Sequence, residues 1–204
     1  MDVLWLSFRA KNVWARFLTQ YVYRSQFAAI GKRSIIIKPI LIRNARAISL
    51  GADCGIRNNA RIEVLHPSHD GLPRLIMGDG TTIEQDVHII CGNKIRIGNR
   101  VTIAPRVTIL DTVHSHDDPS DNSGIGSRTP SQNLTVEIGD QAFLGVGVVV
   151  MPGVQIGKFC IIGANSVVTK SLPDYCVCAG SPAQVIKRYD FEIKAWLKEK
   201  TEKD

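Results

Sequence analysis

A six-residue hydrophobic period constrains the fold of this 204-residue chain more than any other feature. Between residues 138 and 168 an aliphatic side chain falls on every sixth position, and earlier stretches keep the same unit in other phases. A period of six fits neither the 3.6-residue turn of a helix nor the alternation of a long strand, but it fits short strands joined by turns. The aliphatic positions are Leu50, Ile56, Ile62; Met77, Ile83, Ile89; Ile97, Ile103, Ile109; and Ile138, Leu144, Val150, Ile156, Ile162, Val168.

Three such units make one triangular coil of a mainly-β, parallel β-helix. The aliphatic residue points into the prism, and the small residue that follows it, as at Gly139, Gly145 and Gly157, fits the crowded corner. Glycine there is also expected to supply corner dihedrals that a Cβ would oppose. Stacked coils then pair as parallel strands about 4.8 Å apart. A β-sandwich is the weaker alternative, because turns of variable length separate sandwich strands.

The repeat predicts a β-helix domain over residues 31–186, with insertions at 66–75 and 111–135 that are rich in turn formers. Residues 1–30 place apolar side chains among basic ones at helical spacing, which predicts an N-terminal helical segment. We expect it to pack on the prism or on a neighbouring subunit, and weak contact with a membrane surface is the alternative. Residues 187–204 are predicted to form an amphipathic C-terminal helix that caps the open end of the prism.

The amino-acid composition indicates which binding partners and which cellular compartment to expect. The formal charge of +6 comes from basic residues spread along the chain, without the aromatic-basic motif of a nucleic-acid module, so no nucleic acid is expected. An anionic ligand or an acidic membrane surface suits this charge. No apolar run reaches the roughly 18 residues of a membrane span, and no secretory signal is recognised, so we expect a soluble, cytoplasmic protein. Five cysteines without a CxxC pair indicate small buried side chains, neither a disulfide framework nor a zinc site.

Four stretches resemble the hexapeptide-repeat acyltransferases, and within them the galactoside, maltose, polysaccharide and xenobiotic O-acetyltransferases. They are Ile103–Thr108 (IAPRVT), Ile138–Gly145 (IGDQAFLG), Val150–Gly157 (VMPGVQIG) and Ala179–Ala183 (AGSPA). The resemblance covers roughly residues 35–189. It implies a left-handed β-helix, a homotrimer with active sites between subunits, and acetyl-CoA as acyl donor with no metal.

The function that the resemblance implies is acetyl transfer to a hydroxyl of a sugar or polysaccharide precursor. An antibiotic or other xenobiotic acceptor is the alternative within the same chemistry. A carbonic anhydrase on the same fold would need three metal-binding histidines, for which His88, His114 and His116 are the candidates. A non-enzymatic scaffold that uses the prism only as an assembly surface is a further alternative.

Acetyl transfer to a hydroxyl needs a base, and histidine is the side chain best suited near neutral pH. Counted from Ala104-Pro105, His114 falls where the galactoside-type enzymes carry their catalytic histidine. His116, two residues later, is the alternative base or an acceptor contact. The other histidines, His66, His69 and His88, lie in the short insertion or at an outward position.

Three further residues are candidates for the acceptor side. Asp111 is the carboxylate nearest to His114 in sequence, and it either orients the base or forms a turn at the start of the loop. Glu84 lies where the resembled enzymes carry an acceptor-binding asparagine, so it is either a site residue or a solvated glutamate. Phe143, where several relatives have tryptophan, forms an apolar wall of the acceptor site or a core contact.

Six residues are candidates for the donor side. The resemblance places Gly145 and Ala164 along a narrow pantetheine groove and Ser181 of the Gly-Ser-Pro-Ala stretch beside the donor. Charge complementarity makes Lys170, Lys187 and Arg188 candidates for the nucleotide phosphates, with a solvated cation as the alternative for each.

Overall fold

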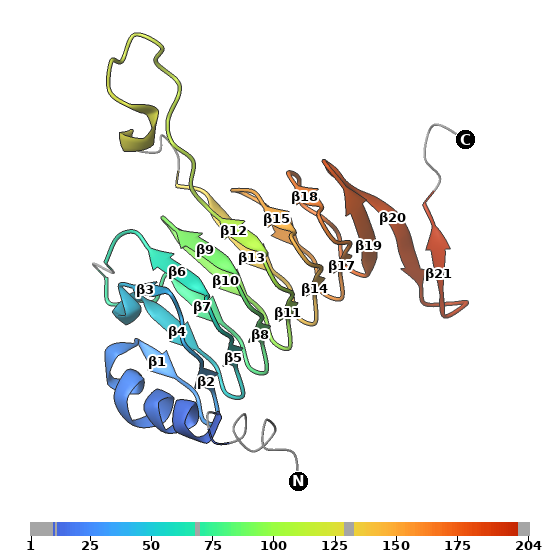
Figure 1. Ribbon diagram of the computed structural model, residues 1–204. Coiled ribbons are helices and arrows are strands. Elements are labelled where there is room, and N and C mark those ends of the chain that lie inside the picture. Colours follow the sequence, from blue (N-terminus) through green and yellow to red (C-terminus); the bar gives the residue numbers. More distant parts are fainter. Residues whose placement is uncertain (1–9, 11, 68–69, 129–132, 200–204) are drawn as a thin grey trace.

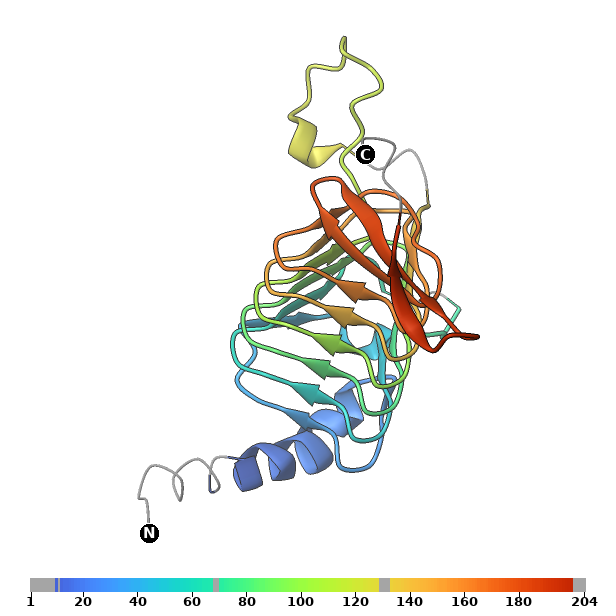
Figure 2. The same cartoon turned by 90° about the vertical axis from the view of Figure 1, so that its right-hand side faces the viewer.

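The protein is a triangular prism of stacked coils with one parallel sheet on each side (Figures 1 and 2). This computed structural model describes residues 10, 12–67, 70–128 and 133–199. Sheet A contains β1 (Ala29–Ile30), β4 (Ile48–Leu50), β7 (Leu75–Met77), β10 (Lys94–Ile97), β13 (Thr135–Ile138) and β16 (Gln155–Ile156). Sheet C contains β3 (Leu41–Arg43), β6 (Arg61–Val64), β9 (His88–Cys91), β12 (Thr108–Leu110), β15 (Val149–Val150) and β18 (Val167–Val168).

Sheet B is longer because a C-terminal antiparallel extension continues it. It contains β2 (Ile35–Ile36), β5 (Gly55–Ile56), β8 (Thr82–Ile83), β11 (Thr102–Ile103), β14 (Phe143–Leu144), β17 (Ile161–Ile162), β19 (Cys176–Gly180), β20 (Ala183–Asp190) and β21 (Ala195–Lys198). The chain visits the sheets in the order A, B, C, so each coil has an AB, a BC and a CA corner. These corner names locate the candidate site residues below.

Three ladders of buried aliphatic side chains form the core and confirm the predicted period. In sheet A, Ile97 pairs with Met77 on one side and with Ile138 on the other. Equivalent ladders run through Ile103 in sheet B and Ile109 in sheet C. The predicted aliphatic positions are buried, and a first coil with Ile30 and Ile36 precedes them. The five cysteines are free and buried, as predicted.

The glycines that follow the aliphatic residues of sheet A stack at the AB corner for a steric reason. A Cβ built on Gly139 would lie 2.4 Å from the backbone nitrogen of Lys158 in the next coil, and Gly98 is similarly confined by Asp140. Left-handed backbone occurs two residues further on, at Gln141 (φ 59°) and Phe159 (φ 54°). The prediction that these glycines supply the corner dihedrals is therefore wrong: they provide space for the neighbouring coil.

Asn and Asp side chains at the same corner bridge successive coils. Asp140 Oδ1 accepts a hydrogen bond from the Asn99 backbone N–H (2.7 Å), and Asn99 Oδ1 accepts one from Asp79 N–H (2.9 Å). Asp174 Oδ1 does the same for Lys158 N–H (2.9 Å). The hydrogen bonds from Asn99 hold the pKa of the Asp140 carboxyl below its ordinary value. These side chains satisfy corner donors that the strand ladders leave unpaired.

The predicted N-terminal helical segment is confirmed over its described part, and it packs on the first coil. Residues 12–17 are α-helical, and they continue into a π-turn, η1 (Leu18–Val22), and a 3₁₀ turn, η2 (Tyr23–Gln26). The buried Thr19 hydroxyl accepts a hydrogen bond from Ile36 N–H (2.9 Å). Gln20 Nε2 donates one to Ser34 O (3.0 Å). Residues 1–9 and 11 lie outside the described part of the chain.

Two isolated 3₁₀ turns, η3 (Ala45–Ala47) and η4 (Ile125–Ser127), complete the helical elements. Among the described residues, no helix combines the length and the apolar character that a bilayer crossing demands.

The predicted C-terminal helix over 187–204 is wrong for residues 187–198. These residues belong to β20 and β21 and to the turn between them, which extend sheet B as an antiparallel meander. Tyr189 stands directly opposite Trp196, with ring centroids 5.3 Å apart, and such cross-strand aromatic pairs stabilise strands. Pairing between the two strands outweighs the helical preference that the spacing of a few apolar residues indicates. Residues 200–204 lie outside the described part.

Both insertions leave the prism at the CA corner. The first joins β6 to β7 and the second joins β12 to β13, so each runs from sheet C to sheet A. The second projects far from the prism (Figure 1). His66 therefore shares a corner with His114 and His116, whereas residues 68–69, including His69, lie outside the described part.

We predict that Gly139→Ala destabilises the fold by about 1–3 kcal/mol, because its Cβ meets backbone that belongs to a packed coil. Gly124→Ala is the matched control, since a Cβ at Gly124 on the projecting loop has no atom within 4 Å. Urea unfolding of both variants measures the difference. Equal stabilities would contradict the steric explanation of the corner glycines.

Candidate active site

The stem of the long loop is held by a buried carboxylate. Asp111 is 1% exposed, and its Oδ1 accepts a hydrogen bond from Gly92 N–H (2.5 Å) while Oδ2 accepts one from Asn93 N–H (2.9 Å). The Asn93 side chain in turn donates from Nδ2 to Leu134 O (3.1 Å) at the other end of the loop. The 92–93 turn of the preceding coil therefore ties both ends of the loop. The sequence analysis did not single out Asn93. The break in the six-residue period just before Lys94 is the signal that points to it.

His114 lies three residues beyond this anchor and is exposed. Among the described residues its imidazole makes no hydrogen bond, and its backbone carbonyl lies 3.4 Å from Nδ1 of His116. Because the Asp111 carboxylate is directed at the 92–93 turn, the structure does not pair Asp111 with His114. Of the two alternatives left open for Asp111, the geometry matches the turn-forming one.

The outer part of the loop is held together by its own polar groups. Arg128 forms an ion pair with Asp121 (Nε to Oδ2, 3.2 Å) and donates hydrogen bonds to the carbonyls of Asp118 (3.2 Å) and Ser123 (3.1 Å). Hydrogen bonds from Ser120 lower the pKa of the Asp118 carboxyl, and those from Ser123 lower the pKa of Asp121. These contacts join residues 118, 121 and 123 to residue 128 within the described part of the loop.

Gly145 and Ala164, the two residues predicted to line the pantetheine groove, meet at the BC corner. Gly145 N–H donates to Ile162 O (2.9 Å), and a Cβ on Gly145 would lie 2.8 Å from the Ala164 backbone nitrogen. Phe143 is exposed on the outer side of sheet B, in register with Thr102. Small residues therefore stack at this corner, and Phe143 is exposed two residues before Gly145.

Glu84 occupies the same corner two coils earlier. Its carboxylate lies 3.8 Å from Nε of Arg57, and both side chains are partly exposed. The pair is a surface ion pair, whose contribution to stability is small.

The candidate residues fall into two groups on opposite sides of sheet C. Glu84, Gly145 and Ala164 lie at the BC corner, before the sheet C strand of their coil. Asp111, His114, His116 and Lys170 lie at the CA corner, after it. Lys170 follows β18 as Asp111 follows β12, two coils along the same ladder. Within one protomer the predicted groove and the predicted base are thus one side of the triangle apart.

The C-terminal hairpin carries the remaining donor candidates. Ser181 is exposed in the turn between β19 and β20, where the Ser181–Pro182 peptide bond is cis. Arg188 donates to Glu199 (Nε to Oε2, 3.0 Å). Lys187 stands directly opposite Lys198, and like charges in such a pair repel. Acidic side chains, Asp190, Glu192 and Glu199, accompany the basic ones on this hairpin, so its charges nearly balance.

His88 does not join the other histidines. It lies on the outer side of sheet C, with Nε2 3.4 Å from Oε1 of Glu63, which also pairs with Arg61 (2.7 Å). Arg61, and to a smaller extent His88, hold the pKa of Glu63 below its ordinary value. No cluster of three potential metal ligands occurs among the described residues. The convergence of His88, His114 and His116 that a carbonic anhydrase would need is absent from this arrangement.

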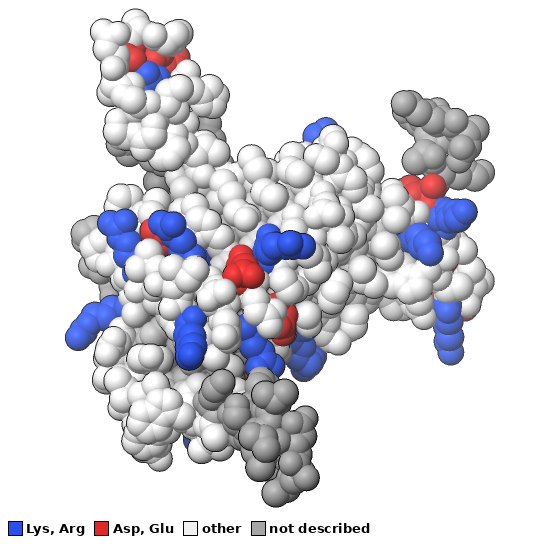
Figure 3. Space-filling model, in the orientation of Figure 1, with Lys and Arg blue, Asp and Glu red and all other residues white. Residues whose placement is uncertain are grey.

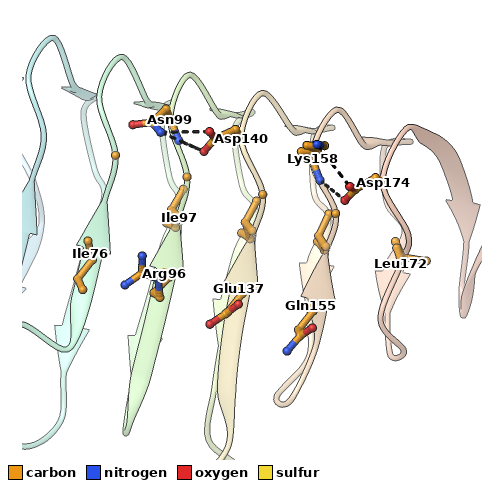
Figure 4. Close-up of a pocket in the computed structure, with 16 residues that line it drawn as sticks. Ile76, Arg96, Ile97, Asn99, Glu137, Asp140, Gln155, Lys158, Leu172 and Asp174 are labelled. Atoms are coloured by element: carbon orange, nitrogen blue, oxygen red, sulfur yellow. Dashed lines mark hydrogen bonds and ion pairs between the residues drawn. The ribbon is translucent and has the colours of Figure 1, made fainter. Parts of the chain in front are cut away.

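A polar groove of about 600 Å³ runs along the AB corner and the outer side of sheet A (Figure 4). At the corner its polar side chains are paired with one another, Asn99 with Asp140 and Lys158 with Asp174 (3.9 Å), and these pairs belong to the coil-to-coil ladder. Arg96, Glu137 and Gln155 line the groove from sheet A, and the column of glycines forms its wall at the corner. It lies at a different corner from both groups of candidate residues, so we do not place the reaction there.

Comparison with known proteins places the chain in a family. Residues 135–170 match the family model described as bacterial transferase hexapeptide (six repeats). The putative lipopolysaccharide biosynthesis O-acetyl transferase WbbJ of Escherichia coli K12 is 34% identical over 180 residues, which span 81% of this chain and 90% of that protein. The chain belongs to the bacterial hexapeptide transferase family. It is an acyltransferase.

Two solved structures agree with the left-handed parallel β-helix of the hexapeptide transferases. A hexapeptide-repeat acetyltransferase from Vibrio cholerae O1 biovar eltor, complexed with acetyl coenzyme A, has a TM-score of 0.54 at 20% identity, over 92% of this chain and 90% of that one. A mutant of AntD, an N-acyltransferase from Bacillus cereus in complex with dTDP and coenzyme A, has a TM-score of 0.59 at 24% identity, over 82% and 87% of the two chains. These similarities establish the fold.

We predict that Asp111→Asn in this hexapeptide transferase lowers stability by about 1–3 kcal/mol, because an amide turns an N–H₂ toward one of two buried backbone donors. Proteolysis within the loop should accelerate as its stem loosens. The control is Asp86→Asn, an exposed turn position on the prism where we expect a change within about 0.5 kcal/mol. Urea unfolding and limited proteolysis measure both effects, and equal behaviour of the two variants would remove the anchoring role of Asp111.

Proposed function

We propose that this acyltransferase is a trimeric, acetyl-CoA-dependent O-acetyltransferase that modifies a hydroxyl of a sugar or polysaccharide precursor, with His114 as the general base. The observation that carries the proposal is the 34% identity over 180 residues to a protein named for O-acetyl transfer in lipopolysaccharide biosynthesis. A structural neighbour complexed with acetyl coenzyme A supports the choice of donor. The five free cysteines favour a reducing compartment, so we assign the reaction to the cytoplasm.

His114 has the exposure and the anchoring that a base needs before substrate arrives. Its imidazole is free of hydrogen bonds within the described chain, while the loop stem behind it is fixed by Asp111 and Asn93. In the proposed step, Nε2 or Nδ1 takes the proton of the acceptor hydroxyl as the oxygen attacks the thioester carbonyl. The imidazolium then returns that proton to the departing thiolate of coenzyme A. The acetyl group ends on the acceptor oxygen, and the ring is restored to its neutral form.

A trimer resolves the separation between the base and the donor groove. His114 lies at the CA corner and Gly145 at the BC corner, on the two sides of sheet C. In a ring of three protomers the CA corner of one subunit meets the BC corner of the next, so each interface assembles one complete site. This arrangement accounts for a site whose parts do not converge within a single protomer.

Coenzyme A is anionic at one end and narrow in the middle, and this chain offers a partner for each part. The Gly145–Ala164 surface suits pantetheine, since a larger residue at Gly145 has no room. Lys170 and Lys187 make no ion pair among the described residues, whereas Arg188 is partly neutralised by Glu199. We therefore assign the phosphate contacts mainly to the two lysines, with Arg188 and Ser181 in support.

The acceptor is assigned to the side of the groove that Phe143 borders. An exposed aromatic ring offers a flat apolar surface, on which the C–H face of a sugar ring packs while its hydroxyls stay free. Glu84 and His116 supply hydrogen-bonding groups near the same interface. Glu84 lies at the BC corner, and His116 lies in the histidine loop, the insertion between β12 and β13. We no longer include Asp111, whose two oxygens are taken by the 92–93 turn.

We predict that His114→Ala lowers kcat by about 10² to 10⁴, because a positioned base contributes that much to the rate. His116→Ala is the matched control and should stay within about tenfold of the wild type. Release of free thiol from acetyl-CoA, in the presence of lipopolysaccharide-type oligosaccharides, measures both. Donor affinity and oligomer mass should be unchanged, since each side chain is exposed on the loop.

Two outcomes would contradict this assignment. If His116→Ala is inactive while His114→Ala turns over normally, the base is assigned to the wrong residue. If both variants are fully active, histidine-base acetyl transfer is wrong for this protein.

We also predict that Lys170→Ala and Lys187→Ala each raise the KM for acetyl-CoA roughly three- to tenfold, with a smaller effect on kcat. The increase should shrink as salt is added, because salt screens exposed charges. Lys94→Ala, an exposed lysine on sheet A, is the control of equal charge change. If both variants have the same KM for acetyl-CoA as the Lys94→Ala control, the two lysines do not contact coenzyme A and are solvated surface cations.

A further inference from the structure

We call the helical residues 12–26, which pack on the first coil, the N-terminal cap of the prism. The cap has one buried face and one exposed face. One face is built into the fold: Ala15 and Thr19 are buried, and the Thr19 hydroxyl donates a hydrogen bond to Ala15 O (2.7 Å) while accepting one from Ile36 N–H (2.9 Å). Gln20 adds a hydrogen bond to the first coil. These bonds fix the cap on the prism, so its opposite face is held pointing away from the first coil.

That other face is apolar and uncovered among the described residues. We call Val13, Trp14, Phe17 and Tyr21 the aromatic face, and their exposed fractions are 68%, 62%, 48% and 76%. The Trp14 ring stacks on Phe17 with centroids 5.6 Å apart, and Phe17 lies against Tyr21 in a tilted pair with centroids 4.9 Å apart. Contiguous exposed apolar surface of this kind on a protein marks an interaction site.

Charge around the aromatic face is mainly positive, although Asp53 pairs with Arg33 and lies near Arg16. The basic residues are spread along the chain, but residues 3–52 contain no acidic residue and nine Lys or Arg. In the remainder of the chain, acidic and basic residues nearly cancel. Figure 3 shows Lys and Arg side chains projecting from the half of the prism nearest the cap. Arg16, Arg24 and Lys32 are exposed on the cap and the first coil.

We propose that the N-terminal cap binds the surface of a membrane that contains anionic lipids, with the aromatic face in the interface and the surrounding basic residues on the headgroups. Trp, Tyr and Phe beside Lys and Arg are the side chains that suit this boundary, where apolar rings and cations find their partners within a few ångströms. Each Lys or Arg near an anionic surface contributes attraction that falls off within a Debye length. The inference does not depend on the proposed acetyl transfer.

The same charges argue against a second copy of the chain as the occupant. Two aromatic faces brought together would bring two mainly basic surroundings with them, and like charges across an interface oppose association. A lipid headgroup layer supplies the opposite sign. The cap lies on the surface and does not cross it, since it is a short helix with one face bound to the first coil. The histidine loop and the C-terminal hairpin lie away from the cap (Figure 1).

Co-sedimentation of the full chain with vesicles tests the proposal. The vesicles are phosphatidylcholine alone or phosphatidylcholine with about a third phosphatidylglycerol. We expect binding to the anionic vesicles that weakens with salt, and little binding to the neutral ones. Trp14→Ser combined with Phe17→Ser should reduce the bound fraction at least about tenfold. The control is Ile125→Ser, an exposed apolar side chain on the projecting loop, which should bind as the wild type does.

A second variant protects the test against misfolding of the first. Arg16→Glu combined with Arg24→Glu leaves the aromatic face intact and should lose the preference for anionic vesicles, with the thermal melt as the check on folding. Equal binding to neutral and anionic vesicles would overturn the proposal. So would unchanged vesicle binding by the Trp14/Phe17 variant, or a smaller oligomer for that variant with vesicle binding intact, because the aromatic face would then be a contact between subunits.

Discussion

The stacking of one aliphatic side chain on the next, along each side of the triangle, is the interaction on which the rest of this structure depends. No coil buries its own interior, because a coil contributes only one layer of the prism. Ile103, for example, is enclosed by Ile83 below and Leu144 above in the same ladder. The spacing of stacked coils then imposes the close approach at the AB corner, where Gly139 has no room for a Cβ. An open stack also needs ends, and the N-terminal cap and the antiparallel strands β20 and β21 supply them.

A rigid stack lets loops be displayed at chosen corners. Both insertions emerge at the CA corner, and the second is held at its stem by the Asp111 carboxylate and the Asn93 side chain. Short turns at the BC corner bring Gly145 and Ala164 of successive coils together, with no room for a larger side chain at Gly145. The division of labour that we propose matches this geometry: the base is assigned to the loop at the CA corner, the donor to the BC corner, and the proposed assembly of protomers brings the two together. The cap at the far end is free to take a different partner.

The period predicted the fold because it is a local property with a single structural solution. The period could not predict which residues share a corner, because the lengths of the insertions hide the register between coils. Only the pairing of β12 with β15 and of β15 with β18 places Lys170 at the same corner as His114. The glycines were located correctly but explained wrongly, because confinement by Lys158 of the next coil is a tertiary fact. Helical spacing misled at the C-terminus, where the pairing of Tyr189 with Trp196 decides the structure. Asp111 was recognised as a candidate, but its partners on the 92–93 turn lie in another coil.

The central claim, that base and donor groove come from different subunits, is tested most directly by mixing two inactive variants. His114→Ala removes the base and keeps the groove, whereas Ala164→Trp fills the groove at an exposed position and keeps the base. Refolding an equal mixture forms trimers in which some interfaces join an intact base to an intact groove. With random mixing, we predict that activity recovers to roughly a quarter of the wild-type value, while each variant alone stays inactive. A mixture that assembles into trimers but recovers no activity would contradict the shared site.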